Sequence, residues 1–196
     1  MEKKLSNKIE LNIIGIINLS SMHLTDQSLP PIIEKAFHGK SKKRNGLMLR
    51  DNSITSFGVR ILVEQLLSMK VKLKYLSLSN NIEVKDSGIE HLCHLIQENQ
   101  SIAFLSIGNT GITNRSVQLL ANSLKDHGKG SYLEKIYLCH NREITDDALD
   151  SLIKIVEQNE KLKFFSLEYC NLSEQTLKIF KQSISKKQRK ILTIIE

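Results

Sequence analysis

Two groups of residues have the types and the close spacing that metal binding or nucleophilic catalysis would need. The first is His91, Cys93 and His94, and the second is the adjacent pair Cys139 and His140. Imidazole and thiolate both bind zinc, and a thiolate beside an imidazole is a possible nucleophile. However, His91 and His94 share one face of a predicted helix while Cys93 points away. Consecutive strand residues also point to opposite sides, so we expect both groups to be structural.

No catalytic motif accompanies these residues. The chain has no G-x-x-x-x-G-K-[ST] phosphate loop, no G-x-S-x-G, no H-E-x-x-H and no C-x-x-C. The sequence therefore predicts a protein that is not an enzyme and that uses no cofactor, no metal ion and no small-molecule substrate. An enzyme centred on Cys139 and His140 stays open as an alternative, and a thiol-reactive probe on Cys139 would test it.

An internal repeat determines the elements that must position these side chains. Four segments follow the pattern L-x-x-L-x-L-x-x-N/C, with Thr once in the last place, at residues 73–81, 102–110, 133–141 and 162–170. Two less regular copies lie upstream, one from Ile14 to Met22 and one at Leu47, Leu49 and Asn52. The Asn or Cys that ends each copy is expected to bond backbone groups of neighbouring repeats.

Each copy continues in the same way, with a helix-start position and then an amphipathic stretch at helical spacing. A hydroxyl at the start position can accept a bond from a backbone N–H of the first turn. Five of the six positions carry a hydroxyl, and they recur every 28 to 32 residues: Thr25, Thr55, Lys85, Thr113, Thr145 and Ser173. The sequence thus predicts alternating short strands and helices that must stack to bury their apolar faces.

This pattern resembles the leucine-rich repeat family in its ribonuclease-inhibitor subtype, whose repeat has about 28–29 residues. The resemblance implies an α/β solenoid, a right-handed horseshoe arc of about six repeats with a parallel sheet on the concave face and helices outside. It covers residues 12–185, with a cap or loose segment at 1–11 and a cap strand or tail at 186–196. Such arcs can cover the active site of an enzyme, and others act as scaffolds or regulators. The chain is also similar to small repeat effectors that intracellular bacteria deliver into host cells.

In this repeat, the residues that flank the buried L-x-L positions face the concave surface because strand side chains alternate. The residues expected on that face include five of the ten aromatic residues of the chain, which has no Trp. We expect these five to anchor a protein partner, because rigid aromatic side chains dominate binding hot spots. Aromatic residues also favour strands for packing alone, so covering the sheet is the alternative reading. The five are Tyr75, Phe104, Tyr137, Phe164 and Tyr169.

Polar residues on the same face are expected to orient the partner. They are Arg50, Asp51, Lys135, His140 and Glu168, together with Met48, Ser77 and Ser106 between them. The prediction is a non-catalytic module that binds one folded protein through its concave face. A partner that is an enzyme would then be inhibited or regulated by having its active site covered.

The charge pattern supplies an alternative function. The formal net charge is +7, and basic residues cluster at 40–44 and 178–190. These clusters could bind nucleic acid or an anionic membrane surface, making the chain a basic adaptor. A nucleic-acid partner is not favoured, because no aromatic residues interleave with the clusters. Binding through the clusters would weaken steeply with salt, whereas binding through an aromatic groove would persist.

Composition limits the compartment. Three widely separated cysteines, Cys93, Cys139 and Cys170, exclude a disulfide scaffold and fit a reducing environment. No apolar run approaches the roughly 20 residues of a membrane span, and no secretory signal is recognised at the start. We therefore expect a cytoplasmic protein, or one delivered into a host cytosol by a route that needs no signal peptide.

Overall fold

The chain is an α/β protein built on one largely parallel sheet. A computed structural model describes residues 10–11, 15–38, 44–124, 132–186 and 192–194. The eight strands lie in chain order from β1 to β8, β1 pairs antiparallel with β2, and every later pair is parallel. The strands are β1 (Glu10–Leu11), β2 (Ile16–Asn18), β3 (Gly46–Met48), β4 (Tyr75–Ser77), β5 (Phe104–Ser106), β6 (Lys135–Tyr137), β7 (Phe164–Ser166) and β8 (Leu192–Ile194).

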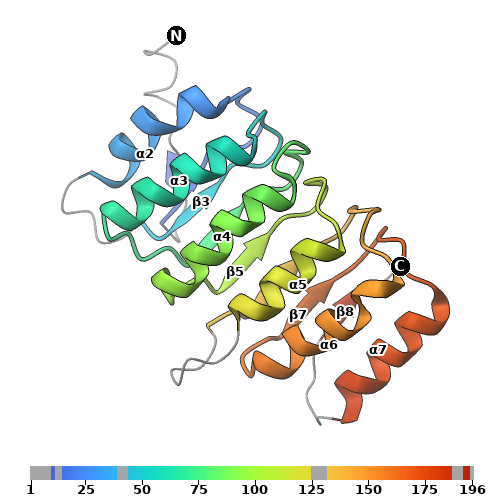
Figure 1. Cartoon of the computed structure of the whole chain (residues 1–196). Coiled ribbons are helices and arrows are strands. Elements are labelled where there is room, and N and C mark those ends of the chain that lie inside the picture. The colour runs from blue at the N-terminus through green and yellow to red at the C-terminus, as the bar shows by residue number, and fades with distance from the viewer. Residues whose placement is uncertain (1–9, 12–14, 39–43, 125–131, 187–191, 195–196) are drawn as a thin grey trace.

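The helices form a single layer over one face of this sheet (Figure 1). Each α-helix connects two consecutive parallel strands, so neighbours in the chain are also neighbours in space. We call the sheet face without helices the open face. The helices are α2 (Leu29–Phe37), α3 (Ser56–Ser68), α4 (Lys85–Asn99), α5 (Asn114–Ser123), α6 (Leu149–Gln158) and α7 (Glu174–Lys186), with short 3-10 helices η1 (Asp26–Ser28) and η2 (Asp146–Ala148).

The hydrophobic core lies between the sheet and the helix layer. The two apolar residues of each L-x-L segment point into it, as the sequence predicts, and most of them are fully buried. Helix residues such as Leu62, Leu92 and Leu120 pack against them from the other layer. Full burial of one such side chain contributes about 1.5–3 kcal/mol to folding. The buried strand pairs are Ile17 and Leu19, Leu47 and Leu49, Leu76 and Leu78, Leu105 and Ile107, Ile136 and Leu138, and Phe165 and Leu167.

The asparagine prediction is confirmed by a ladder of bonds between repeats. Asn81 is 1% exposed, and its Nδ2 donates to the carbonyl oxygens of Leu49 at 3.0 Å and Leu78 at 2.7 Å. Its Oδ1 accepts from the backbone N of Ile54 at 3.0 Å. Asn52 and Asn141 make equivalent bonds, and the Cys170 thiol lies 3.4 Å from the Leu138 carbonyl oxygen that it donates to. One side chain thus satisfies three buried backbone groups across two repeats.

Direct capping by a hydroxyl is confirmed at three of the five positions that carry one. The hydroxyl of Thr55 accepts from the Phe57 backbone N at 3.2 Å, and Thr113 caps α5 in the same way. Ser173 accepts from the backbone N of Thr176 at 3.2 Å. Thr25 precedes the 3-10 helix η1 and forms a capping box with Ser28, whereas Thr145 precedes η2 and makes no side-chain cap bond. Lys85, which has no hydroxyl, has a left-handed φ of 51°.

A second set of contacts at the helix starts was not predicted. The Asp26 carboxylate accepts from the Thr55 backbone N at 2.9 Å and from the Thr55 hydroxyl at 2.6 Å, which ties one helix start to the next. We call this pairing an acid clasp, and its sequence signal is an Asp or Asn directly after the cap residue. Similar contacts join Asp86 to Thr113, Asn114 to Thr145, and Asp146 to Ser173.

Candidate protein-binding surface

Four aromatic rings form a continuous row across strands β4 to β7 on the open face. We call Tyr75, Phe104, Tyr137 and Phe164 the aromatic ribbon. Successive ring centroids are 6.1, 5.2 and 4.7 Å apart, within the range of favourable tilted ring contacts. All four side chains are half-buried, so one side of each ring supports its neighbour while the rest remains accessible.

Strand register explains how the ribbon is assembled. Tyr75 pairs with Phe104, Phe104 with Lys135, and Lys135 with Phe164, so these residues occupy one column of the sheet. Lys135 interrupts the aromatic column. Tyr137, two residues further along β6, contacts the rings of both Phe104 and Phe164 and closes the row.

The second residue after each L-x-L segment has an uncommon backbone conformation. All six have φ between 51° and 61°, the left-handed region. We call them the rim positions. Asn, Asp and His tolerate this conformation, whereas a bulky residue there is strained by about 1–2 kcal/mol. The rim positions are Ser21, Asp51, Asn80, Asn109, His140 and Tyr169.

Tyr169 is the most unusual rim residue. Its φ is 56°, and its side chain is 62% exposed, the highest value among the exposed large hydrophobic residues that the structure describes. Its ring stacks on His140 with centroids 4.4 Å apart and planes 19° apart. The backbone of Tyr169 is strained, and its ring is supported by His140 on one side and exposed on the other. Such a ring is pre-organised for binding.

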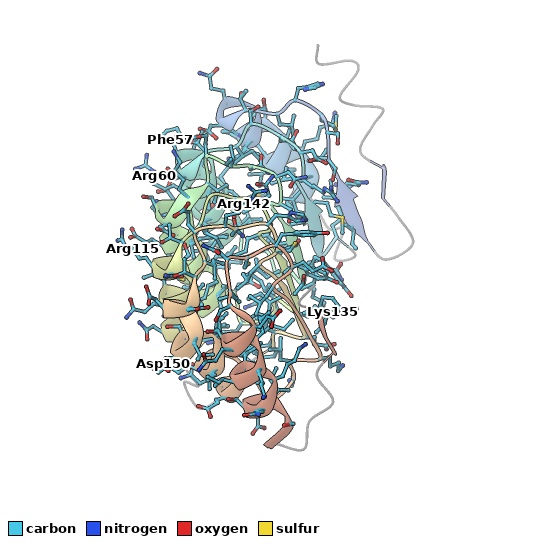
Figure 2. All side chains as sticks on the ribbon, turned by 90° about the vertical axis from the view of Figure 1, so that its right-hand side faces the viewer. Phe57, Arg60, Arg115, Lys135, Arg142 and Asp150 are labelled. Carbon is cyan, nitrogen blue, oxygen red and sulfur yellow. The ribbon has the colours of Figure 1, made fainter. Side chains whose placement is uncertain are left out.

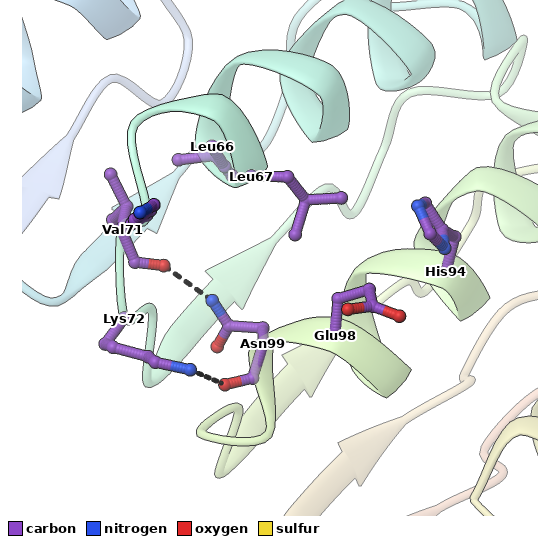
Figure 3. Close-up of a pocket in the computed structure, with 8 residues that line it drawn as sticks. Leu66, Leu67, Val71, Lys72, His94, Glu98 and Asn99 are labelled. Atoms are coloured by element: carbon purple, nitrogen blue, oxygen red, sulfur yellow. Dashed lines mark hydrogen bonds between the residues drawn. The ribbon is translucent and has the colours of Figure 1, made fainter.

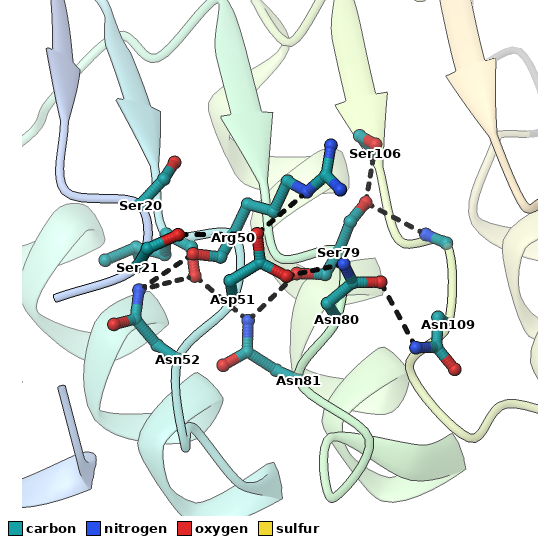
Figure 4. Close-up of polar contacts among 12 residues, drawn as sticks. Ser20, Ser21, Arg50, Asp51, Asn52, Ser79, Asn80, Asn81, Ser106 and Asn109 are labelled. Atoms are coloured by element: carbon teal, nitrogen blue, oxygen red, sulfur yellow. Dashed lines mark hydrogen bonds and ion pairs between the residues drawn. The ribbon is translucent and has the colours of Figure 1, made fainter. Parts of the chain in front are cut away.

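The rim after β3, β4 and β5 is polar and internally bonded (Figure 4). Arg50 and Asp51 form an ion pair at 3.1 Å, and Asn80 donates to the Asp51 carboxylate at 2.5 Å. Asn109 donates to the Asn80 side-chain oxygen at 3.2 Å. These bonds hold the Arg50 and Asp51 side chains in defined positions.

Some residues on the open face are too buried to offer much surface to a partner. Ser77, one of the predicted contact residues, is only 6% exposed, so little of it is accessible to a partner. Ser166 and Ile16, which also flank the buried L-x-L positions, are 2% and 4% exposed. The reason is crowding: Ser166 pairs with Tyr137 inside the ribbon, and Ile16 leans over Gly46, where an added Cβ would lie 2.8 Å from the Ile16 Cγ1.

The remaining predicted contact residues reach the surface to different degrees. Arg50, Asp51, Lys135, His140 and Tyr169 are exposed, whereas Met48, Ser106 and Glu168 are half-buried. Figure 2 shows Lys135 on the sheet side, opposite Phe57, Arg60 and Arg115 on the helix side. The open face therefore combines the aromatic ribbon, the exposed Tyr169 and a small set of fixed charges.

The cysteines of the two groups singled out in the sequence, Cys93 and Cys139, lie in the helix layer and in the turn after β6. Cys93 is buried in α4, where burial raises its thiol pKa to about 11. Burial also raises the pKa of Cys139, and its neighbour His140 stacks on Tyr169. A raised pKa keeps a thiol protonated at neutral pH, which gives nucleophilic chemistry no support. Among the described residues, no group of three His, Cys, Asp or Glu side chains is placed to hold a metal ion.

The basic clusters are only partly described. Residues 40–43, 187, 189 and 190 lie outside the described ranges, while Lys178 and Lys181 are exposed. Arg44 has a structural role, because its guanidinium donates to the carbonyl oxygens of Lys35 and Ala36 at the end of α2.

A hollow of about 430 Å³ lies on the helix side, between the C-terminal ends of α3 and α4 (Figure 3). Its polar groups largely satisfy each other. Asn99 donates to the Val71 carbonyl oxygen at 2.6 Å, and the Lys72 ammonium donates to the Asn99 carbonyl oxygen at 2.8 Å. Leu66 and Leu67 supply its apolar wall. We assign it a packing role between adjacent helices.

No protein-family model matches the chain, and no curated protein sequence matches it. In the part of the chain that the structure describes, no helix is both long and apolar enough to cross a membrane.

Proposed function

We propose that the chain is a leucine-rich repeat solenoid of the ribonuclease-inhibitor subtype and that it binds one folded protein through the open face, without catalysing a reaction. In this proposal the open face is the concave surface of the arc. The strands in chain order, the single helix layer and the asparagine ladder support it.

The aromatic ribbon is the observation that carries the proposal. The rings of the aromatic ribbon lie on the sheet face away from the core, where they contact each other and stay partly accessible. They therefore form an apolar surface that a partner can cover. Tyr169, which follows β7, adds an exposed ring next to a strained backbone conformation. Aromatic side chains bury a large area at a small entropy cost, so they suit an interface centre.

The dimensions of the face suit a protein partner. Six strands, β2 to β7, at about 4.8 Å spacing make a surface roughly 25–30 Å wide. With its flanking loops, such a surface accommodates a standard interface of about 800 Å² per partner. Binding of an enzyme in this position would block access to the covered part of the enzyme. Inhibition or regulation by coverage is therefore the consequence that we propose.

A capture experiment tests this proposal. The wild-type chain, the Phe104→Ala/Tyr137→Ala variant and a Phe57→Ala control are immobilised at physiological salt, and proteins from cell extracts are compared quantitatively. Phe57 is a matched control because it is an aromatic residue, 52% exposed, on the helix side of α3. We expect a protein that the wild type and the control retain and that the double variant binds at least tenfold more weakly.

Folding of the double variant is checked by circular dichroism and thermal unfolding. Tyr169→Ala serves as a second variant, because this exposed side chain contributes little to the core. Equal retention of all partners by the wild type and both open-face variants would refute the proposed surface. Partners that are lost only as salt rises, and that no open-face variant affects, would favour the basic adaptor instead.

A further inference from the structure

The two edges of the sheet carry opposite charge. The strand-start edge consists of the described connections from each helix to the next strand, and the strand-end edge consists of those from each strand to the next α-helix. At the strand-start edge the described basic residues are Arg44, Lys70, Lys72, Lys74, Lys161 and Lys163, against the acidic Glu134 and Glu160. At the strand-end edge the described acidic residues are Asp26, Asp51, Glu83, Glu143, Asp146, Asp147 and Glu168, against the basic Arg50 and Arg142.

Part of this separation stabilises the fold. Acidic residues at helix starts and basic residues at helix ends complement the helix dipoles. Asp26 and Asp146 belong to acid clasps, and the ammonium of Lys72 donates to the Asn99 carbonyl oxygen at the end of α4. Lys161 lies over the Tyr132 ring, 4.8 Å from its centroid. These charges already have internal partners.

Three further lysines lie next to the aromatic ribbon, and only one of them, Lys163, forms an ion pair with another described residue. Lys135 occupies the ribbon column between Phe104 and Phe164, and Lys74 directly precedes Tyr75. Both side chains are exposed, and neither forms an ion pair with another described residue. Lys163 directly precedes Phe164, and its ammonium lies 2.8 Å from the Glu134 carboxylate. We call Lys74, Lys135 and Lys163 the lysine strip.

From this arrangement, and resting on the proposed function, we propose that the partner of the open face presents an acidic surface to the lysine strip. When a partner covers the ribbon, water is excluded beside Lys74 and Lys135, and the lower local dielectric strengthens their attraction to a carboxylate. At the strand-end edge, Glu168, which forms no ion pair with another described residue, repels the same acidic surface. The partner is therefore bound in one orientation, with its acidic side over the strand-start edge and its apolar groups on the ribbon.

The two parts of this surface have separate kinetic signatures. Exposed charges mainly steer association, so the lysine strip raises the association rate and makes it sensitive to salt. Buried aromatic contacts mainly slow dissociation. Reversing the charge of the strip should therefore lower the association rate about tenfold, whereas removing ribbon rings should raise the dissociation rate.

A displayed library of random 16-residue peptides supplies the probe. Peptides are selected on the wild-type chain at about 0.15 M salt and counter-selected on the Phe104→Ala/Tyr137→Ala variant, so that every survivor needs the ribbon. Surviving peptides are synthesised, and their binding kinetics are measured against the wild type, Lys74→Glu/Lys135→Glu and Lys154→Glu/Lys178→Glu. The last variant has the same change in net charge, and both of its positions are exposed on the helices α6 and α7.

The proposal expects survivors that combine Asp or Glu with large apolar residues. It also expects a tenfold lower association rate for Lys74→Glu/Lys135→Glu and less than a twofold change for the helix-side control. Ribbon-dependent peptides without acidic enrichment, or with equal kinetics on both charge variants, would overturn the acidic partner and leave the proposed function standing. If no peptide depends on the ribbon, the proposed function itself fails.

Discussion

At the residue scale, Asn81 shows how much one side chain can hold together. It bonds the carbonyl oxygens of Leu49 and Leu78 and the backbone N of Ile54 while almost fully buried. Its loss would leave buried backbone groups of two repeats without partners. A buried polar group without a partner costs about 1–3 kcal/mol, so the asparagine ladder is a main source of order between repeats.

We expect Asn81→Ala to lower the unfolding free energy by about 2–4 kcal/mol in urea titrations. Asn81→Cys should cost less, because Cys170 shows that a thiol at the equivalent position can donate to a carbonyl oxygen. A control, Asn122→Ala on the exposed surface of α5, should change stability by less than about 0.5 kcal/mol. Equal losses for Asn81→Ala and the control would contradict the ladder.

A substitution at Tyr169 should change partner affinity much more than it changes the unfolding free energy. Glycine removes the left-handed strain, which gains about 1 kcal/mol, but Tyr169→Gly also loses the His140 stack, worth about 0.5–1.5 kcal/mol. We therefore expect little change in unfolding free energy and at least a tenfold loss of partner affinity. Ser21→Gly, at the far end of the rim, should stabilise the chain and leave affinity unchanged. If Tyr169→Gly keeps full affinity, Tyr169 is outside the interface.

At the element scale, periodicity predicted the strands and helices because the L-x-L pattern and the helical spacing both follow from burial. It also placed Tyr75, Phe104 and Phe164 in one column, which the strand register confirms. It did not predict the contact of Tyr137 with Phe104 and Phe164, because ring contacts depend on side-chain direction between columns.

Other features of the elements escaped the sequence for a related reason. Thr25 and Thr145 look like ordinary helix caps, but each precedes a 3-10 helix, since the hydroxyl pattern does not distinguish the two kinds of turn. The burial of Ser77 reflects crowding by neighbouring strands, which a one-dimensional pattern cannot show. The sequence pattern predicted the asparagine bonds and the column of rings, but not how closely side chains of adjacent strands pack.

The acid clasp makes an unusual prediction for a helical glycine. An exposed helix position gains about 0.5–1 kcal/mol when Gly becomes Ala. At Gly58 in α3, however, an added Cβ would lie 2.1 Å from the Asp26 Oδ1. We expect Gly58→Ala to lower the unfolding free energy by about 1–2 kcal/mol, because it displaces the carboxylate from Thr55. In an Asp26→Ala background the same change should cost clearly less, and equal costs in both backgrounds would refute the coupling.

At the scale of the whole molecule, stability should be distributed along the stack rather than around one centre. Strands and helices contact mainly their neighbours in chain order, so the end units lack one neighbour each. Native-state hydrogen exchange should show the strongest protection in α3, α4 and α5 and weaker protection in α2 and α7. Uniform protection across all the helices would mean that the chain unfolds only as one unit.

The chain order of the strands also bears on how such a surface can change over time. Because every connection joins adjacent strands, duplicating one unit of about 29 residues lengthens the sheet by a strand without rerouting any loop. Strand side chains alternate between the core and the open face, so residues on the open face can be substituted while the core keeps its packing. The core residues can therefore stay the same while the residues of the open face change, and each duplicated unit widens the open face by about 4.8 Å.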